Sequence, residues 1–246
     1  MERKEMNIDI SKVKGIIFDY GGTIDTGGDH WSEVIWAAWQ KAGVVADKAE
    51  FRDVYVYAER ELARTLHILP HHTFHDLLDI KMQIELQRLA EIGHFAPAEV
   101  DAKAKEVAQY CYDSAKASVE KSKSVIAALA KKYPLVLVSN FYGNVETVLA
   151  EFGLAEYFKK VIESAVVGVR KPDPKIFTLG VEALGLKPEE VLVFGDSYSK
   201  DIVPAEKAGC QVMWLKGKGW TREEDDTFHP NIIHSLEQGL AFLEGA

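Results

Sequence analysis

Asp19 follows directly on the short apolar run at residues 15–18, and two glycines, Gly21 and Gly22, come just after it. A buried strand of this kind delivers a carboxylate to its C-terminal tip. The glycines let the backbone fold tightly around a bound group. In an open parallel sheet, ligands bind outside the carboxyl ends of the strands. The pattern predicts a carboxylate that carries out chemistry; the alternative is an aspartate that only caps a turn.

Three further segments favour the catalytic interpretation. Two more apolar runs, residues 135–138 and 191–194, also end in polar residues, and a proline-stiffened loop between them carries a lysine. The polar residues of these segments are Ser139, Asn140, Lys171, Asp196 and Asp201. The strand tips would thus present two carboxylates and a hydroxyl next to a cation.

These segments resemble, in order, the four motifs of the haloacid dehalogenase-like hydrolase superfamily, most of whose members are phosphatases. The motif residues are Asp19 with Gly22-Thr23, then Ser139, then Lys171, and finally Gly195-Asp196 with Asp201. The resemblance runs from about residue 13 to the end of the chain and is weakest between the first two motifs. Each motif is common alone, whereas the ordered set is specific.

The resemblance implies a Mg²⁺-dependent phosphoester hydrolase that acts through an aspartyl-phosphate on Asp19. Mg²⁺ prefers oxygen ligands, and the implied set is Asp19, the backbone carbonyl of Gly21, Asp196 and Asp201, the last directly or through water. Lys171 would offset charge on the nucleophile and the phosphate. The groups implied to hold the phosphoryl oxygens are Ser139, Asn140, Gly22 and Thr23.

One position departs from the pattern of most phosphatases in the superfamily, which carry a second aspartate two residues after the nucleophile. This chain has Gly21 there. A positioned general acid–base contributes about 10²–10⁴-fold, so the omission is large. Phosphomutases depend on this group most and are disfavoured. The acid–base would come from elsewhere, and the candidates are Asp25, Asp29, His30 and the histidines at 67–75.

Other chemistries stay open beside the phosphatase. Haloacid dehalogenases carry a tyrosine at this position, need no metal and lack the Gly-Asp ligand, so Gly195-Asp196 argues against them. Phosphonatases place a small residue there and recruit a cap lysine, for which Lys41 and Lys48 are candidates. A weakly active relative that binds phosphate-bearing ligands or a protein partner is the third alternative.

Composition bounds the remaining classes. A chain of 246 residues with 47% hydrophobic residues can bury a full core, and no apolar stretch reaches the length of a membrane span. The formal charge of −9 disfavours nucleic-acid binding. The N-terminus lacks a secretory signal, and Cys111 and Cys210 have no metal-ligand spacing, so we expect a cytoplasmic protein with reduced thiols. The expected partner is a small phosphorylated substrate, and the chain would be a monomer or homodimer.

Strands alternating with helices predict an α/β fold, a doubly wound parallel sheet of Rossmann-like type. The expected strands are 14–19, 134–138, 160–163, 190–194 and 211–215. The expected core helices are 143–152, 174–184, 200–208 and 235–244. Residues 29–132 form one long helical region, and Thr73 with Asp76 reads as a capping box that opens a helix within it.

The helical region predicts an inserted cap domain of four helices that closes over the site and selects substrates. The expected domains are a core of residues 1–27 and 119–246 and a cap of residues 28–118, with hinges near 26–29 and 117–121. Within the cap, Trp31, Trp36 and Trp39 cannot share one helical face, so one of them would face the cleft or all would pack in the core. Four clustered histidines suggest zinc binding, substrate contact or an exposed loop; they are His67, His71, His72 and His75.

Overall fold

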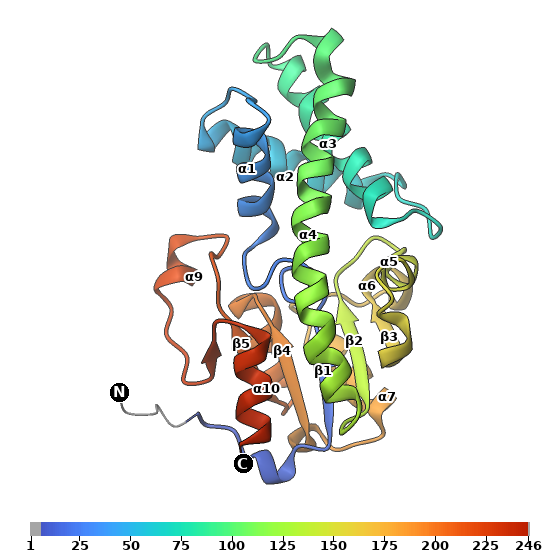
Figure 1. Ribbon diagram of the computed structural model, residues 1–246, viewed down its shortest axis with the longest axis vertical. Helices are drawn as coiled ribbons and strands as arrows, with labels where there is room; N and C mark the ends of the chain where they lie inside the picture. The colour runs from blue at the N-terminus through green and yellow to red at the C-terminus, as the bar shows by residue number, and fades with distance from the viewer. Residues whose placement is uncertain (1–5, 246) are drawn as a thin grey trace.

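The computed structural model describes residues 6–245, and its core is one parallel sheet of six strands in the order β3-β2-β1-β4-β5-β6 (Figure 1). The strands are β1 Gly15–Phe18, β2 Leu135–Ser139, β3 Phe158–Glu163, β4 Val191–Gly195, β5 Gln211–Leu215 and β6 Ile232–Ile233. The central strands β1, β2 and β4 are buried along their whole length, because helices cover both faces of the sheet. The α/β doubly wound fold predicted from the sequence is confirmed.

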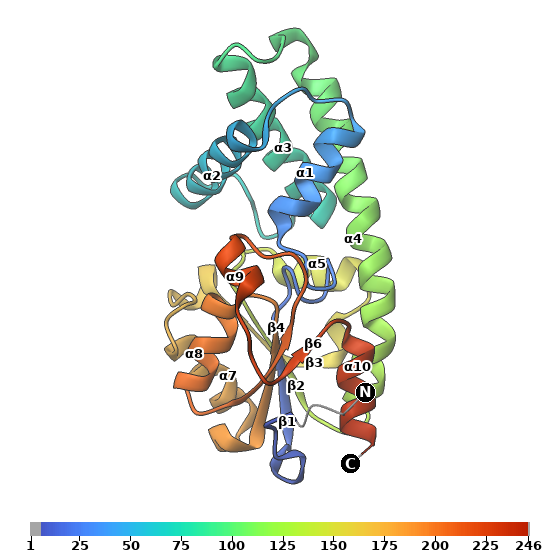
Figure 2. The ribbon, with the colours of Figure 1, turned by 90° about the vertical axis from the view of Figure 1, so that its left-hand side faces the viewer.

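The sheet lies between two helical layers (Figure 2). Successive strand residues alternate between two apolar clusters, so that Ile16 and Phe18 face one layer while Ile17 faces the other. One layer holds the lower half of α4 (Val100–Ala130) together with α10 (Leu236–Glu244), and the other holds α7 (Lys175–Leu184) and α8 (Val203–Lys207). The remaining core helices are α5 Val145–Glu151, α6 Ser164–Val167 and α9 Arg222–Asp226.

A second helical unit stands over the carboxyl ends of the strands (Figures 1 and 2). It consists of α1 (Trp31–Lys41), α2 (Lys48–Arg64), α3 (Phe74–Glu91) and the upper half of α4. The capping box predicted at Thr73 is confirmed: the Thr73 hydroxyl accepts from the Asp76 N–H at 3.1 Å, and the Asp76 carboxylate accepts from the Thr73 N–H at 2.8 Å. This unit is the helical cap predicted from the sequence.

The second predicted hinge, at residues 117–121, is wrong. These residues lie inside α4, a single helix of 31 residues that runs from the top of the cap down beside the sheet (Figure 1). Residues 100–130 contain neither glycine nor proline and are rich in alanine and lysine, which favour an unbroken helix. The first predicted hinge, at residues 26–29, falls in the irregular segment between β1 and α1, and its role as a hinge remains a prediction. The domain limits at residues 27/28 and 118/119 remain a prediction.

The sequence patterns also missed short elements, namely β6, α6 and α9, whose few residues carry little periodicity. Among the residues that the structure describes, none of the helices is long and apolar enough to span a bilayer.

Candidate active site

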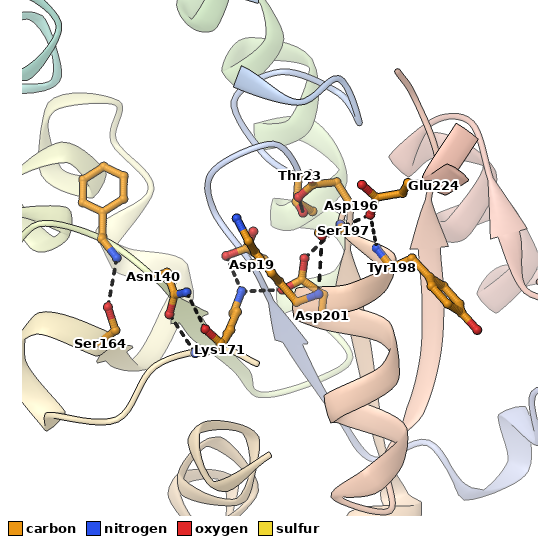
Figure 3. Close-up of polar contacts among 12 residues, drawn as sticks. Asp19, Thr23, Asn140, Ser164, Lys171, Asp196, Ser197, Tyr198, Asp201 and Glu224 are labelled. Carbon is orange, nitrogen blue, oxygen red and sulfur yellow. Dashed lines mark hydrogen bonds and ion pairs between the residues drawn. The ribbon is translucent and has the colours of Figure 1, made fainter. Parts of the chain in front are cut away.

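The order of the strands brings the predicted motif residues together. Strand β1 lies between β2 and β4 in parallel register, so the residues that follow these three strands emerge side by side. Asp19 follows β1, Ser139 ends β2 and Asp196 follows β4. Carboxylate oxygens of Asp19, Asp196 and Asp201 all lie within 4.8 Å of one another. The three carboxylates therefore form one cluster at the tips of the central strands (Figure 3).

Lys171 lies against two of these carboxylates. Its ammonium Nζ is 2.6 Å from Asp19 Oδ1 and 2.6 Å from Asp201 Oδ1 (Figure 3). The three side chains are almost fully buried, with at most 7% of any of them exposed. Asp201 also accepts from the Ser197 N–H at 3.0 Å through its other oxygen. Lys171 and Ser197 thus use both oxygens of Asp201 and fix its orientation.

The loop that carries Lys171 is held by Asn140. The Asn140 side chain donates to the Lys171 carbonyl at 3.1 Å and accepts from the Lys171 N–H at 2.9 Å. This reciprocal pair ties the loop to the residue that follows β2. Ser139 is buried at the end of β2, and its hydroxyl lies close enough to the Asp19 carboxylate to lower the pKa of Asp19. Asn140 and Ser139 both line the cavity over the strand tips, where the resemblance placed them.

The pKa values of the cluster reflect an excess of buried negative charge. Burial raises the pKa of Asp19, although the charge of Lys171 opposes it. Burial also raises the pKa of Asp196 well above its ordinary value, and the nearby charges of Asp201 and Asp19 add to the effect. Three carboxylates share a single ammonium, so the cluster retains negative charge that a cation would neutralise.

The residues of this cluster fit a hard divalent cation. All the available donors are oxygens, which Mg²⁺ prefers, and the acidic cluster is the single group of metal-ligand side chains found within residues 6–245. Gly21, whose backbone carbonyl the resemblance implied as a ligand, lines the same cavity. A divalent cation held there would supply charge neutralisation for an anionic substrate.

Two of the residues implied to hold phosphate already make hydrogen bonds within the protein. Gly22 has φ +94°, and a Cβ at this position would lie 2.2 Å from an Asp196 carboxylate oxygen, so only glycine fits. Its N–H donates to Asp25 at 2.7 Å. Thr23 is fully buried and donates its hydroxyl to Asp196 at 2.9 Å. Neither residue lines the cavity; both position Asp196 and the turn, and their contact with substrate remains a prediction.

Position 21 is open, in contrast to position 22. A Cβ on Gly21 would meet nothing closer than the Trp31 ring at 3.9 Å, and the residue has no left-handed φ. Trp31 in turn donates its indole N–H to Asp25 at 3.0 Å. Of the three tryptophans discussed above, Trp31 lines the cavity, whereas Trp36 and Trp39 pack against Phe51 inside the cap.

His30 is the one sequence-predicted acid–base substitute that lines the cavity among the described residues. Burial lowers the pKa of His30 to about 3, and its Nδ1 accepts from the Ser32 N–H at 3.2 Å, which leaves the proton of the neutral ring on Nε2. Asp25 lies behind the cavity wall, and burial raises its pKa to about 8. Asp29 accepts from the Lys218 N–H at 2.8 Å instead.

The four cap histidines do not assemble a metal site within residues 6–245, so the zinc interpretation is wrong. They lie on the outside of the cavity and have other partners. His67 lies 3.1 Å from Glu61, and His75 lies 3.1 Å from Gln109. The candidate cap lysines lie elsewhere too: Lys41 is over the Tyr110 ring, and Lys48 pairs with Glu33.

The cavity holds polar residues that the sequence analysis missed. Its volume is about 600 Å³, and the cap contributes Glu59 and Lys81 to its wall, while the loop after β2 contributes Tyr142. A usable signal was present on α3, where Lys81 and Glu85 occupy positions of the buried stripe that otherwise holds leucine and methionine. A charged residue in such a stripe indicates a buried partner or a site.

A family model described as haloacid dehalogenase-like hydrolase matches residues 13–209. The chain belongs to this family. The matched range contains all four motif segments, from Asp19 to Asp201.

Two relatives that match part of this chain are named as phosphatases. The chain is 39% identical over 80 residues to a phosphoserine phosphatase of Thermus thermophilus, a match that covers 32% of this chain and 31% of the relative. It is 38% identical over 91 residues to a glyceraldehyde 3-phosphate phosphatase of Methanocaldococcus jannaschii, covering 37% and 40%. The chain thus spans less than half the length of these curated relatives.

A solved structure shares the fold at lower identity. The 2-haloacid dehalogenase from Pseudomonas syringae superimposes with a TM-score of 0.52 at 21% identity, over 95% of this chain and 98% of that one. At this identity the match supports the arrangement of core and cap alone.

Proposed function

We propose that this hydrolase is a Mg²⁺-dependent phosphomonoesterase that acts on a small phosphorylated metabolite with Asp19 as its nucleophile. The observation that carries the proposal is the cluster of Asp19, Asp196 and Asp201 around one lysine at the floor of the cavity. The phosphatase names of the relatives support the same substrate class.

In the proposed reaction an Asp19 oxygen attacks phosphorus, and the bond from phosphorus to the ester oxygen breaks. The leaving oxygen takes up a proton and departs as the alcohol. Water then attacks phosphorus of the aspartyl-phosphate, which releases phosphate and restores the Asp19 carboxylate. Lys171, fixed 2.6 Å from Asp19, offsets negative charge as the phosphoryl group approaches. The Ser139 hydroxyl and the cavity floor orient the phosphoryl oxygens.

Protonation of the leaving oxygen is the step that this site supports least. Gly21 carries no side chain, and His30, the cavity-lining candidate, is a neutral imidazole that gives up its Nε2 proton reluctantly. We therefore expect turnover to fall steeply as the leaving alcohol becomes more basic. Esters of phenols with electron-withdrawing groups should be hydrolysed fastest.

The competing chemistries have less support. Asp196 supplies the metal-ligand carboxylate that haloacid dehalogenases lack. A phosphonatase would need a free cap amine, and the cap lysine that lines the cavity is Lys81, which is paired with Glu59. A relative that only binds phosphate ligands would still show ligand binding without metal-dependent turnover.

The test is hydrolysis of para-nitrophenyl phosphate with Mg²⁺, with EDTA and in Asp19→Asn. This substrate has a good leaving group and does not need the missing acid. The matched control is Asp53→Asn, the same change on the exposed face of α2. We expect Mg²⁺-dependent turnover that Asp19→Asn abolishes and Asp53→Asn retains. Equal activity of Asp19→Asn and the wild type would overturn the proposal.

A further inference from the structure

The cap wall of the cavity is apolar except at a few positions. The cavity-lining side chains Trp31, Tyr55, Leu62, Phe74, Leu77 and Leu78 form most of this wall. Arg64 also lies there, but its side chain is 77% exposed and pairs with Glu61 at the rim. Deeper in the wall, Glu59 of α2 and Lys81 of α3 form an ion pair. An isolated pair of charges on an apolar wall is costly to bury unless its members have partners.

Lys81 is the hidden member of the pair. Its side chain is 5% exposed, its ammonium contacts Glu59, and it lies 4.5 Å from the centroid of the Tyr55 ring. The Glu59 carboxylate and the face of the Tyr55 ring together surround this cation. Lys81 thus has little capacity left for a ligand in the cavity.

Glu59 is the member that faces the cavity. Its side chain is 36% exposed and lies among the cavity-lining residues. Both carboxylate oxygens accept from the Tyr142 hydroxyl, at 3.1 Å and 3.2 Å. Tyr142 comes three residues after Ser139, so the hydrogen bond ties the cap carboxylate to the strand tip that holds the phosphoryl site. A carboxylate accepts more bonds than these, and its remaining capacity is turned to the cavity.

We infer that Glu59 is a specificity-determining residue, which accepts a hydrogen bond from a hydroxyl group on the alcohol part of the substrate. The substrate class is a phosphorylated polyol or sugar, held at its phosphate by the core and at a distant hydroxyl by Glu59. This inference rests on the proposed phosphatase activity and adds the substrate class to it.

The charges around Glu59 favour a neutral donor over a charged one. A substrate ammonium brought to this carboxylate would lie beside the Lys81 ammonium, and like charges repel at this range. A substrate carboxylate at this position would be repelled by the Glu59 carboxylate, because the Lys81 ammonium is already paired with Glu59. The other ammonium whose charge acts on Glu59, that of Lys200, belongs to the core. A hydroxyl avoids both costs and replaces the water that would otherwise satisfy the exposed oxygens of Glu59.

The test compares monophosphates of polyols and sugars of three to six carbons with alkyl phosphates of the same carbon number. Both members of a pair carry the phosphate on a terminal CH2 group and leave as primary alkoxides, so the missing general acid affects them similarly. The readout is the ratio of their kcat/KM values in the wild type, in Glu59→Gln and in Tyr142→Phe. Phosphoethanolamine and phosphoglycolate test the ammonium and carboxylate alternatives. The matched control is Glu61→Gln, the same change on α2 at a residue outside the cavity.

We expect the wild type to prefer at least one polyol phosphate over its alkyl counterpart. Glu59→Gln should reduce that ratio by about 10- to 100-fold, the range of one hydrogen bond to a charged group. Tyr142→Phe keeps the carboxylate but frees its orientation, and it should reduce the ratio less. Glu61→Gln should keep the wild-type ratio.

An unchanged ratio in folded Glu59→Gln and Tyr142→Phe would overturn the inference, as would a wild-type preference for phosphoethanolamine or phosphoglycolate. If Glu59→Gln fails to fold, Tyr142→Phe decides alone. If the inference fails but the wild type still hydrolyses para-nitrophenyl phosphate, the phosphatase proposal stands. If the wild type does not hydrolyse para-nitrophenyl phosphate, both the phosphatase proposal and the inference about Glu59 are overturned.

Discussion

Replacing Gly21 by aspartate should restore the general acid–base that this site lacks. A Cβ at position 21 meets only the Trp31 ring, at 3.9 Å, and Gly21 has no left-handed φ, so the Cβ of an aspartate fits there without moving the backbone. The carboxylates of Asp19 and Asp196 would raise its pKa, which favours the protonated form needed to donate to the leaving oxygen. The change therefore adds an acid to a cavity that already has room for it.

The expected gain follows from the leaving group. For an alkyl phosphate, whose alkoxide must be protonated, Gly21→Asp should raise kcat by about 10²–10⁴-fold, the usual contribution of a positioned acid–base. This corresponds to about 3–5 kcal/mol in the activation free energy. For para-nitrophenyl phosphate the first step needs little proton transfer, so the gain in its rate should be much smaller. The assay is release of alcohol across a series of aryl and alkyl phosphates.

Gly21→Asn is the matched control, since it fills the same space without an acid. The reasoning predicts that the dependence of rate on leaving-group basicity flattens in Gly21→Asp and stays steep in Gly21→Asn. Equal gains in both variants would refute it, because volume alone would then explain the effect. A loss of activity on every substrate in Gly21→Asp would also refute it, since another group would then need the space.

Gly22→Ala should lose turnover and thermal stability, because its Cβ would lie 2.2 Å from an Asp196 oxygen at a φ of +94°; an active variant with a wild-type melting temperature would contradict this. Mg²⁺ at 100 times its dissociation constant should stabilise the wild type by about 2.7 kcal/mol, measured as a rise in melting temperature. Asp196→Asn should remove most of that rise, and an undiminished rise would argue against Asp196 as a ligand. Burial raises the pKa of Glu85 to about 8 despite the charge of Lys81, so the folded chain holds a proton that the unfolded chain loses near its ordinary pKa. Stability should therefore fall by about 1.4 kcal/mol per pH unit between pH 5 and 8 from this group, and Glu85→Gln should remove that component in urea unfolding at pH 6 and 8. Parallel pH profiles of the variant and the wild type would contradict the assignment.

The sequence was sufficient to predict the fold and the floor of the site. Apolar runs long enough for a strand, each ending in a polar residue, predicted β1, β2 and β4, and their parallel pairing places Asp19, Ser139 and Asp196 together. The motif order supplied Lys171, whose contacts with two carboxylates no local pattern encodes.

The contacts of the cap side chains could not be predicted from the sequence. Periodicity tells which residues share a helix face but not what that face meets, so the contact of Glu59 with Lys81 and Tyr142, between three separate segments, was not readable. The His67–His75 cluster suggested a metal because the residues are close in sequence. In the structure His67 and His75 have separate partners, Glu61 and Gln109. The hinge predicted at residues 117–121 lies inside the unbroken helix α4. Composition alone did not exclude a hinge there, because helix propensity describes the whole segment and not a single position.

The central claim, that Asp19 becomes phosphorylated, is tested most directly by acid-quenching a reaction with para-nitrophenyl phosphate and Mg²⁺ and mapping the protein by mass spectrometry. The absent side chain at Gly21 would also have activated the attacking water, so the phosphorylated enzyme should accumulate. The account predicts one phosphoryl group on the peptide that contains Asp19 and none in Asp19→Asn. Steady turnover with no phosphorylated Asp19 peptide at any quench time, or a phosphoryl group on another residue, would contradict it.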